Sequence, residues 1–103
     1  MADKILLINF KFGVSRAEYE QAAASLAGEF AKIPGLRWKI WTINEADSEA
    51  GGVYLFESES ALKAFLSGPL AAQVINHPAF SDLTAKPYDV MGDVTTTTRG
   101  PVA

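Results

Sequence analysis

The stretch 36-LRWKIWTINEADSEAGGVYLF-56 decides the fold. It contains two runs of large side chains, Leu36–Asn44 and Val53–Glu57, separated by the polar segment Glu45–Ala50 and by Gly51-Gly52. Successive side chains of a β-strand point to opposite faces, and large side chains on both faces are typical of buried strands. A short polar link between two such runs is typical of an antiparallel hairpin. The stretch therefore predicts a β-hairpin in the middle of the chain.

A strand and a helix precede this hairpin. The apolar run Lys4–Phe12 predicts a first strand. Ser15 and Glu18 have the spacing of a capping box, which predicts that a helix begins there. Pro34-Gly35 ends it. The apolar stripe of this helix recurs every three or four residues and comprises Tyr19, Ala22, Ala23, Leu26, Phe30 and Ile33.

A second helical region and a last strand follow the hairpin. Ser58 is the expected N-cap of one helix, and Pro69 opens a further short helix that continues to about Asn76. Leu83–Met91 predicts the last strand. Pro87 within it cannot donate to a ladder, so this strand belongs at a sheet edge or carries a bulge. The order β-α-β-β-α-β predicts an α+β, ferredoxin-like domain with a four-stranded antiparallel sheet and helices on one face.

The domain is expected to span residues 3–92, and residues 93–103 form a C-terminal tail. The tail contains Thr95–Thr98, which can form a strand only against a partner. Both faces of the predicted strands are apolar, although two helices cover only one face of a four-stranded sheet. A second copy packed sheet against sheet is the simplest cover for the other face. We therefore predict a homodimer, a dimeric α+β barrel, with the tail contacting the partner subunit.

Composition excludes several classes of function. The 103 residues include no cysteine, which removes disulfides, zinc–thiolate sites and cysteine nucleophiles and favours the cytoplasm. The formal net charge of −3 and scattered basic residues disfavour binding to nucleic acid or to anionic membrane. No apolar run approaches the length of a membrane span, and no signal peptide is expected.

Two central motifs and a later one resemble a known family. The pattern PG-L-x-WK-I-W over residues 34–41, followed by AGG-V-YLF over residues 50–56, closely resembles the YdhR family of putative monooxygenases. Tyr88-Asp89-Val90 is similar to the end strand of that family. The resemblance covers Leu6 to Val90 and implies a dimeric α+β barrel. It also implies similarity to small oxygenases that use neither metal nor organic cofactor.

The candidate catalytic residues are His77 and Asn9. His77 is the only histidine and could take a substrate proton near neutral pH. The alternative is a helix-end histidine that bonds a carbonyl or a water. Asn9 interrupts an apolar strand and could orient a substrate carbonyl, or bond a neighbouring side chain.

The candidate substrate-binding residues are three aromatic and two basic side chains of the hairpin, namely Trp38, Trp41, Tyr54, Lys39 and Arg37. The aromatic rings could line a flat apolar pocket, or simply pack in the core or dimer interface. The two tryptophans point to opposite faces of the strand, so at most one meets a given ligand. The basic side chains could attract a carboxylate or phenolate, or form an interface rim.

The predicted function is that of a cofactor-independent monooxygenase acting on a small aromatic or quinol-like compound. Two alternatives stay open: a haem-binding or haem-degrading protein, and a non-catalytic protein that binds a small ligand. No metal site is predicted. Nucleotide-binding and metalloprotease motifs are absent from the sequence, while haem or flavin binding remains open.

Overall fold

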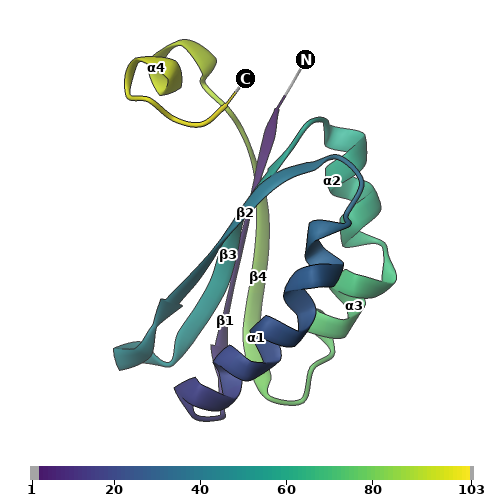
Figure 1. Ribbon diagram of the computed structural model, residues 1–103, viewed down its shortest axis with the longest axis vertical. Coiled ribbons are helices and arrows are strands. Elements are labelled where there is room, and N and C mark those ends of the chain that lie inside the picture. The colour runs from purple at the N-terminus through teal and green to yellow at the C-terminus, as the bar shows by residue number, and fades with distance from the viewer. Residues whose placement is uncertain (1–2, 103) are drawn as a thin grey trace.

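The computed structural model describes residues 3–102 and shows one antiparallel sheet with helices against one face (Figure 1). Its strand order is β2-β3-β1-β4. The elements in chain order are β1 (Lys4–Phe12), α1 (Arg16–Ala31), β2 (Leu36–Asn44), the 3-10 turn η1 (Glu45–Asp47), β3 (Glu49–Phe56), α2 (Glu59–Leu66), α3 (Pro69–Ile75), β4 (Phe80–Asp89) and α4 (Gly92–Thr97). The predicted ferredoxin-like order is thus confirmed.

Local signals set the ends of α1. The Ser15 hydroxyl accepts a hydrogen bond from the Glu18 amide, and the Glu18 carboxylate accepts one from the Ser15 amide, each at 3.1 Å. This reciprocal pair confirms the predicted capping box. After the helix, Gly35 has a φ of 80°, a left-handed conformation that favours glycine. A Cβ at Gly35 would lie 2.5 Å from the Ala61 Cβ, so the link into β2 presses against α2.

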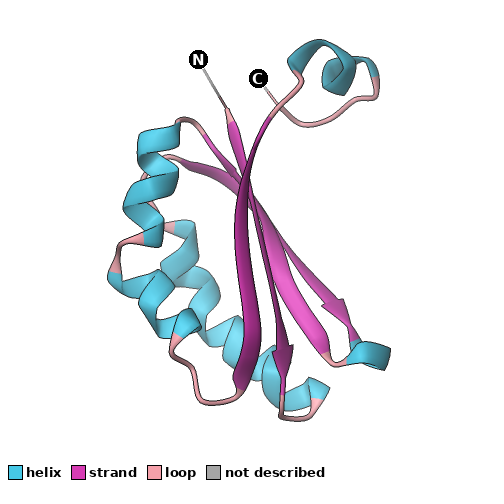
Figure 2. Ribbon diagram, turned by 180° about the vertical axis from the view of Figure 1, so that it is seen from behind, coloured by secondary structure: helices cyan, strands magenta, loops and turns pink. Residues whose placement is uncertain are grey.

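The core lies between the sheet and the helices α1, α2 and α3, which cover the same face (Figure 2). Alternate residues of β1 point into it, as do Tyr54 and Phe56 of β3, with Tyr19 and Phe30 from α1. In the register of the hairpin, Trp41 lies opposite Gly52 and Trp38 opposite Leu55. Neighbouring side chains along a strand point to opposite faces, so Trp41 faces the helices and Trp38 the other side. The predicted separation of the two tryptophans is confirmed.

The turn of the hairpin is shorter than expected. The prediction of a polar turn through Ala50 with a strand from Val53 was wrong, because β3 begins at Glu49 and includes both glycines. Gly51 is needed inside the sheet, since a Cβ there would lie 1.8 Å from the carbonyl oxygen of Ile8. Glycine marks a close backbone approach here rather than a turn.

The last strand begins earlier and ends earlier than predicted, at Phe80–Asp89 instead of Leu83–Met91. Its expected position at a sheet edge is confirmed, because β4 is the last strand in the order and pairs, within residues 3–102, only with β1. Pro87 lies opposite Leu6 in that pairing. The absent amide of Pro87 costs no bond to a further strand.

The segment that follows β4 contains a short helix. The sequence analysis expected a tail in which Thr95–Thr98 form a strand only against a partner; in the single chain, α4 occupies Gly92–Thr97. The hydroxyls of Thr97 and Thr98 donate to carbonyls of the preceding turn, which stabilises the helix locally. The carbonyl of Pro101 then accepts a hydrogen bond of 2.9 Å from the Trp38 indole. The tail therefore folds back over one end of the sheet face that the helices leave open (Figure 1).

None of the helices in the described part of the chain is long and apolar enough to cross a membrane.

Candidate functional site

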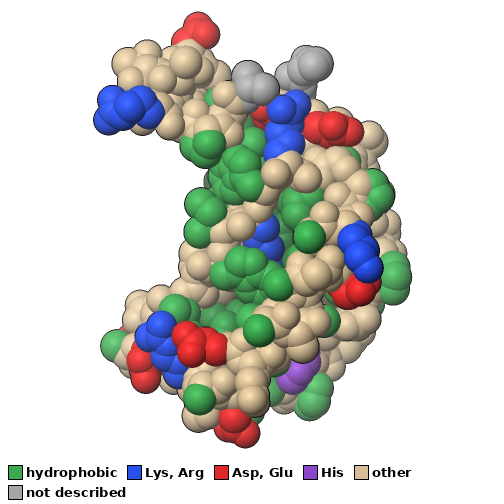
Figure 3. All heavy atoms as spheres, viewed as in Figure 1, with side chains coloured by type: hydrophobic (Ala, Val, Ile, Leu, Met, Phe, Trp, Pro, Cys, Tyr) green, Lys and Arg blue, Asp and Glu red, His purple; other side chains and the backbone are tan. Residues whose placement is uncertain are grey.

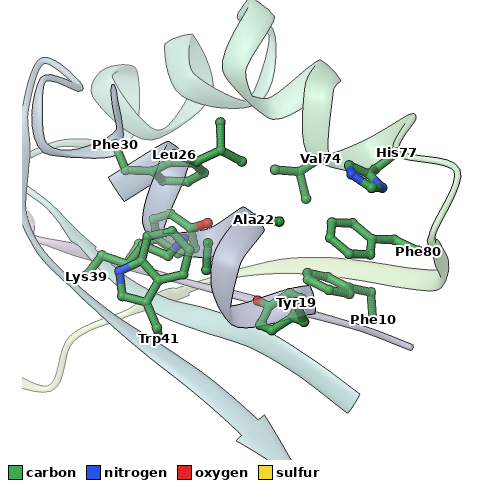
Figure 4. Close-up of a pocket in the computed structure, with 13 residues that line it drawn as sticks. Phe10, Tyr19, Ala22, Leu26, Phe30, Lys39, Trp41, Val74, His77 and Phe80 are labelled. Carbon is green, nitrogen blue, oxygen red and sulfur yellow. The ribbon is translucent and has the colours of Figure 1, made fainter. Parts of the chain in front are cut away.

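An aromatic cavity lies between α1, α3 and the helix-facing side of the sheet (Figure 4). Its lining residues are Phe10, Tyr19, Ala22, Ala23, Leu26, Phe30, Lys39, Trp41, Gly51, Tyr54, Val74, His77 and Phe80. Most of them are apolar, and two carry nitrogen groups that can gain or lose a proton. These two, His77 and Lys39, lie at opposite ends of the cavity in Figure 4.

Lys39 reaches into this space from β2. Its Nζ atom lies 3.3 Å from the ring centroid of Trp41, 3.7 Å from that of Phe30 and 4.7 Å from that of Tyr54. Gly52, the neighbour on β3, makes room for the stem, because a Cβ there would lie 2.7 Å from the Lys39 Cε. The side chain is therefore held in a groove that a larger residue at position 52 would fill.

Burial controls the charge of Lys39. Removal from water lowers the pKa of its amine from 10.5 to about 7. The three ring faces act in the opposite sense, because they attract the ammonium form. Burial is the larger effect. Ring contacts contribute about 0.5–2 kcal/mol, whereas a pKa change from 10.5 to about 7 corresponds to roughly 5 kcal/mol. Within residues 3–102 no carboxylate forms an ion pair with this amine.

His77 follows α3 and closes the other end. Its Nδ1 atom accepts a hydrogen bond of 3.1 Å from the amide of Ala79. With Nδ1 as the acceptor, a neutral ring carries its proton on Nε2 and donates from there. The ring stacks on Phe80 with centroids 4.3 Å apart, and Phe80 stacks on Phe10 at 4.2 Å. The bond from Ala79 and the stacking on Phe80 thus fix the position of the imidazole, and its Nδ1 atom is already occupied.

Two phenols complete the set of ionisable groups around the cavity. Burial raises the pKa of Tyr54 above its usual value of 10.0, and it also raises the pKa of Tyr19. Both side chains therefore stay protonated near neutral pH. A protonated phenol can donate a hydrogen bond to a ligand oxygen.

Two hollows lie beside the cavity, on either side of Trp41. One, of about 330 Å³, separates the alanine-rich face of α1 from β2 and shares Tyr19, Ala23 and Trp41 with the cavity. The other, of about 270 Å³, lies along β2 and shares Phe30, Lys39 and Trp41 with it. The cavity itself measures about 30 Å³, room for one or two water molecules. A ring-sized ligand would reach it only if Trp41 or Lys39 moved.

The structure brings four of the seven predicted site residues together: His77, Lys39, Trp41 and Tyr54 line one cavity. Asn9 and Trp38 lie on the opposite face of the sheet. Asn9 donates to the Glu49 carboxylate at 3.4 Å, so it cannot meet the same small ligand as His77.

Arg37 sits at the irregularity in the pairing of β2 with β3 and pairs with Asp3 at 3.3 Å. It lines the hollow along β2 but not the cavity. The sequence reasoning did not assign Phe30, Tyr19 or Phe80 to a site. The first two belong to the helix stripe that was predicted as core, and a stripe of this kind does not tell core from cavity wall.

The face of the sheet turned away from the helices is partly open. Leu7, Ile40 and Tyr88 on this face are 39%, 53% and 46% exposed. Leu7 and Ile40 flank Val53 in the register, so their side chains are neighbours. In the space-filling view, hydrophobic side chains gather along a concave edge between the C-terminal α4 and the tip of the β2–β3 hairpin (Figure 3).

Solved structures show the same fold at low sequence identity. The protein NE2512 of unknown function from Nitrosomonas europaea matches with a TM-score of 0.73 and 17% identity over 88% of this chain and 91% of that chain. SnoaB, a cofactor-independent oxygenase from Streptomyces nogalater, matches with a TM-score of 0.71 and 17% identity over 87% and 94%. A dimeric ferredoxin-like protein of unknown function from Thermobifida fusca matches with a TM-score of 0.67 and 20% identity over 86% and 92%. At these identities the similarity establishes the fold.

The family follows from the sequence as a whole. The family model described as putative mono-oxygenase ydhR matches residues 5–101. The chain therefore belongs to this family, which confirms the resemblance of the hairpin motifs. The match extends beyond Val90 and includes α4. No curated protein matches the sequence.

Within the described residues, no group of three or more His, Asp or Glu side chains is placed to hold a metal ion.

Proposed function

We propose that the protein is a cofactor-independent monooxygenase that oxidises a small, flat aromatic compound of the quinol or anthrone type. One observation carries this proposal: an enclosed aromatic cavity on the helix side of the sheet has ionisable nitrogen groups at both ends. Membership of a monooxygenase family and the fold shared with SnoaB support the same reaction class.

The reaction needs only the substrate and oxygen. Ionisation of a phenol or enol produces an electron-rich anion, which can pass an electron to oxygen directly. One oxygen atom enters the product as a carbonyl, and the other leaves as water with the two hydrogens removed from the substrate. The protein has to favour the anion and keep water away from the reactive intermediate.

Lys39 and His77 are the proposed groups for handling this charge. The ammonium form of Lys39 stabilises a substrate oxyanion at one end of the cavity. At the other end His77 is the proposed acid–base group. To take a proton on Nε2, its ring must carry the other proton on Nδ1 and release the bond from Ala79; in its present tautomer it donates to a substrate oxygen.

The substrate is proposed to enter through the hollow between α1 and β2. Trp41 is 37% exposed and lies between this hollow and the cavity. A rotation of its side chain would join the two spaces. The joined volume falls in the range of about 300–1,000 Å³ that is common for small-molecule sites.

We also propose a homodimer formed through the open face of the sheet. The exposed side chains of Leu7, Ile40 and Tyr88 form an apolar surface there, and the Thermobifida fusca neighbour is described as dimeric. Light scattering at micromolar concentration is expected to give twice the mass of one chain. Ile40→Asp places a charge in this surface and should give single chains. Lys32→Asp, at the exposed C-terminal end of α1, should leave the dimer intact.

Oxygen uptake tests the enzymatic proposal. Purified protein, treated with a chelator and free of flavin absorbance, is offered a panel of quinols and anthrones in an oxygen electrode. Ala22→Phe fills the cavity and should abolish enzyme-dependent uptake, whereas Ala72→Phe on the exposed side of α3 should retain it. Uptake that is equal in both variants, or that never exceeds the protein-free rate, would contradict the proposal.

A further inference from the structure

A lysine on the core-facing side of a strand is unusual when no acid accompanies it. Lys39 shares its face of β2 with Trp41 and Ile43, and its neighbour across the ladder is Tyr54. Any straight apolar side chain, such as methionine, would fill this position without the cost of burying an amine. The retained amine therefore points to a chemical use of its nitrogen.

The surroundings of the amine favour attack on a neutral, flat electrophile. The titratable side chains that line the cavity and the hollow beside Lys39 are Tyr19, Tyr54, His77 and Arg37, with no carboxylate among the described residues. The aromatic faces of Trp41 and Phe30 lie within 4 Å of Nζ. They offer stacking surfaces to a ring held next to the nitrogen.

Lys39 borders two spaces of unequal size. Lys39 lines both the inner cavity and the hollow of about 270 Å³ along β2. A small molecule in that hollow can approach Nζ without passing through the whole cavity. Gly52 leaves space for the aliphatic part of the Lys39 side chain, which therefore holds the amine in one place instead of moving freely in solvent.

From this geometry we propose that Lys39 is a carbonyl-reactive amine, which binds a small aromatic aldehyde or ketone covalently as an imine. The Nζ lone pair attacks the carbonyl carbon, and a C–N bond forms while a proton moves from nitrogen to oxygen. The resulting carbinolamine loses its hydroxyl group as water, and C=N replaces C=O. One carbonyl compound enters, one water leaves, and no redox partner is needed.

This activity is independent of oxygen and of the proposed oxygenation. An imine withdraws electrons from the carbon next to it, so the same residue would activate a carbonyl compound for proton loss. The neutral amine needed for attack is present near pH 7, because burial lowers the pKa of Lys39 to about 7. The chain's exposed lysines stay almost wholly protonated at this pH.

Reductive trapping tests the proposal. The full chain is incubated with benzaldehyde, and in parallel with the smaller acetaldehyde, at pH 7 and reduced with cyanoborohydride. Intact mass then counts the adducts, and peptide mapping locates them. Lys39 is expected to react at least about tenfold faster than any other lysine. This expectation is conservative, because the fraction of neutral amine at pH 7 is roughly a thousandfold higher for Lys39 than for an exposed lysine.

Matched variants complete the test. Lys39→Arg removes the reactive amine and should abolish the fast adduct, while Lys63→Arg, an exposed residue paired with Glu59, should leave it unchanged. Gly52→Ala crowds the Lys39 stem and should slow the reaction. Mapping of the wild-type adduct decides the matter even if a variant fails to fold. Labelling that follows surface exposure, or Lys39 unmodified by both aldehydes, would overturn the proposal.

Discussion

Replacing Lys39 with methionine should make the protein more stable, and by an amount that depends on pH. Lys39 is charged in the unfolded chain below pH 10.5, but burial lowers its pKa to about 7 in the folded chain. Between these two pKa values the unfolded chain binds more protons, so the contribution of Lys39 to stability rises with pH. At pH 6 both states are charged and the full cost of burying the ammonium is present.

The size of the effect follows from the same numbers. A pKa lowered from 10.5 to about 7 corresponds to a cost of roughly 5 kcal/mol at pH 6. We therefore expect Lys39→Met to raise the free energy of unfolding by up to about 5 kcal/mol at pH 6, and this gain to fall by about 3 kcal/mol by pH 9, because the cost declines by about 1.4 kcal/mol for each pH unit above 7.

Urea unfolding followed by tryptophan fluorescence, at a fixed protein concentration and at pH 6, 7, 8 and 9, measures this dependence. Lys63→Met is the control, because Lys63 is exposed and, among the described residues, pairs with Glu59 on the same helix. Its difference from the wild type should stay small at every pH. A Lys39→Met difference that is equally large at pH 6 and pH 9 would refute the reasoning, because the buried amine would then not change its charge in this range.

Three further predictions concern the scaffold. Gly51→Ala forces a Cβ against a backbone carbonyl 1.8 Å away and should cost about 3 kcal/mol or more in unfolding free energy, measured by urea titration; a change below 1 kcal/mol would contradict the close approach. Ser15→Ala removes the hydroxyl that accepts from the Glu18 amide and should cost about 1 kcal/mol, seen as a lower Tm, while exposed Ala24→Ser should leave Tm nearly unchanged. Trp38→Phe removes the bond to the tail and should speed trypsin cleavage after Arg99 about fivefold, matching about 1 kcal/mol; an unchanged rate would mean that the bond does not hold the tail.

Sequence reasoning predicted most of the fold because its signals were local. The bounds of β1 and β2, the capping box at Ser15 and the edge position required by Pro87 all follow from side-chain periodicity, cap chemistry and the missing proline amide. The error at β3 and the unexpected helix in the tail have another origin. Gly51 looks like a turn residue unless the approach of Ile8 from a distant strand is known. Thr95–Thr98 have side chains that suit a strand, yet the hydroxyls of Thr97 and Thr98 bond the preceding turn.

The site was only partly predictable, because its formation depends on which face of the sheet meets the helices. Lys39 and Trp41 were correctly placed on one face of the strand and Trp38 on the other, but periodicity does not distinguish the covered face from the open one. That choice joins Lys39 with His77, and it separates Asn9 from both. The low pKa of Lys39 could not be read from the sequence, because it results from burial of the amine among side chains that come from two strands and a helix.

Turnover under ¹⁸O₂ tests most directly whether this cavity carries out oxygenation without a cofactor. Protein freed of metal and flavin is mixed with an anthrone or quinol that supported oxygen uptake, and product and water are analysed by mass spectrometry. One ¹⁸O atom in the product and one in water, at a rate lost in Ala22→Phe, is the predicted result. An unlabelled product, or labelling that requires added metal or flavin, would contradict it.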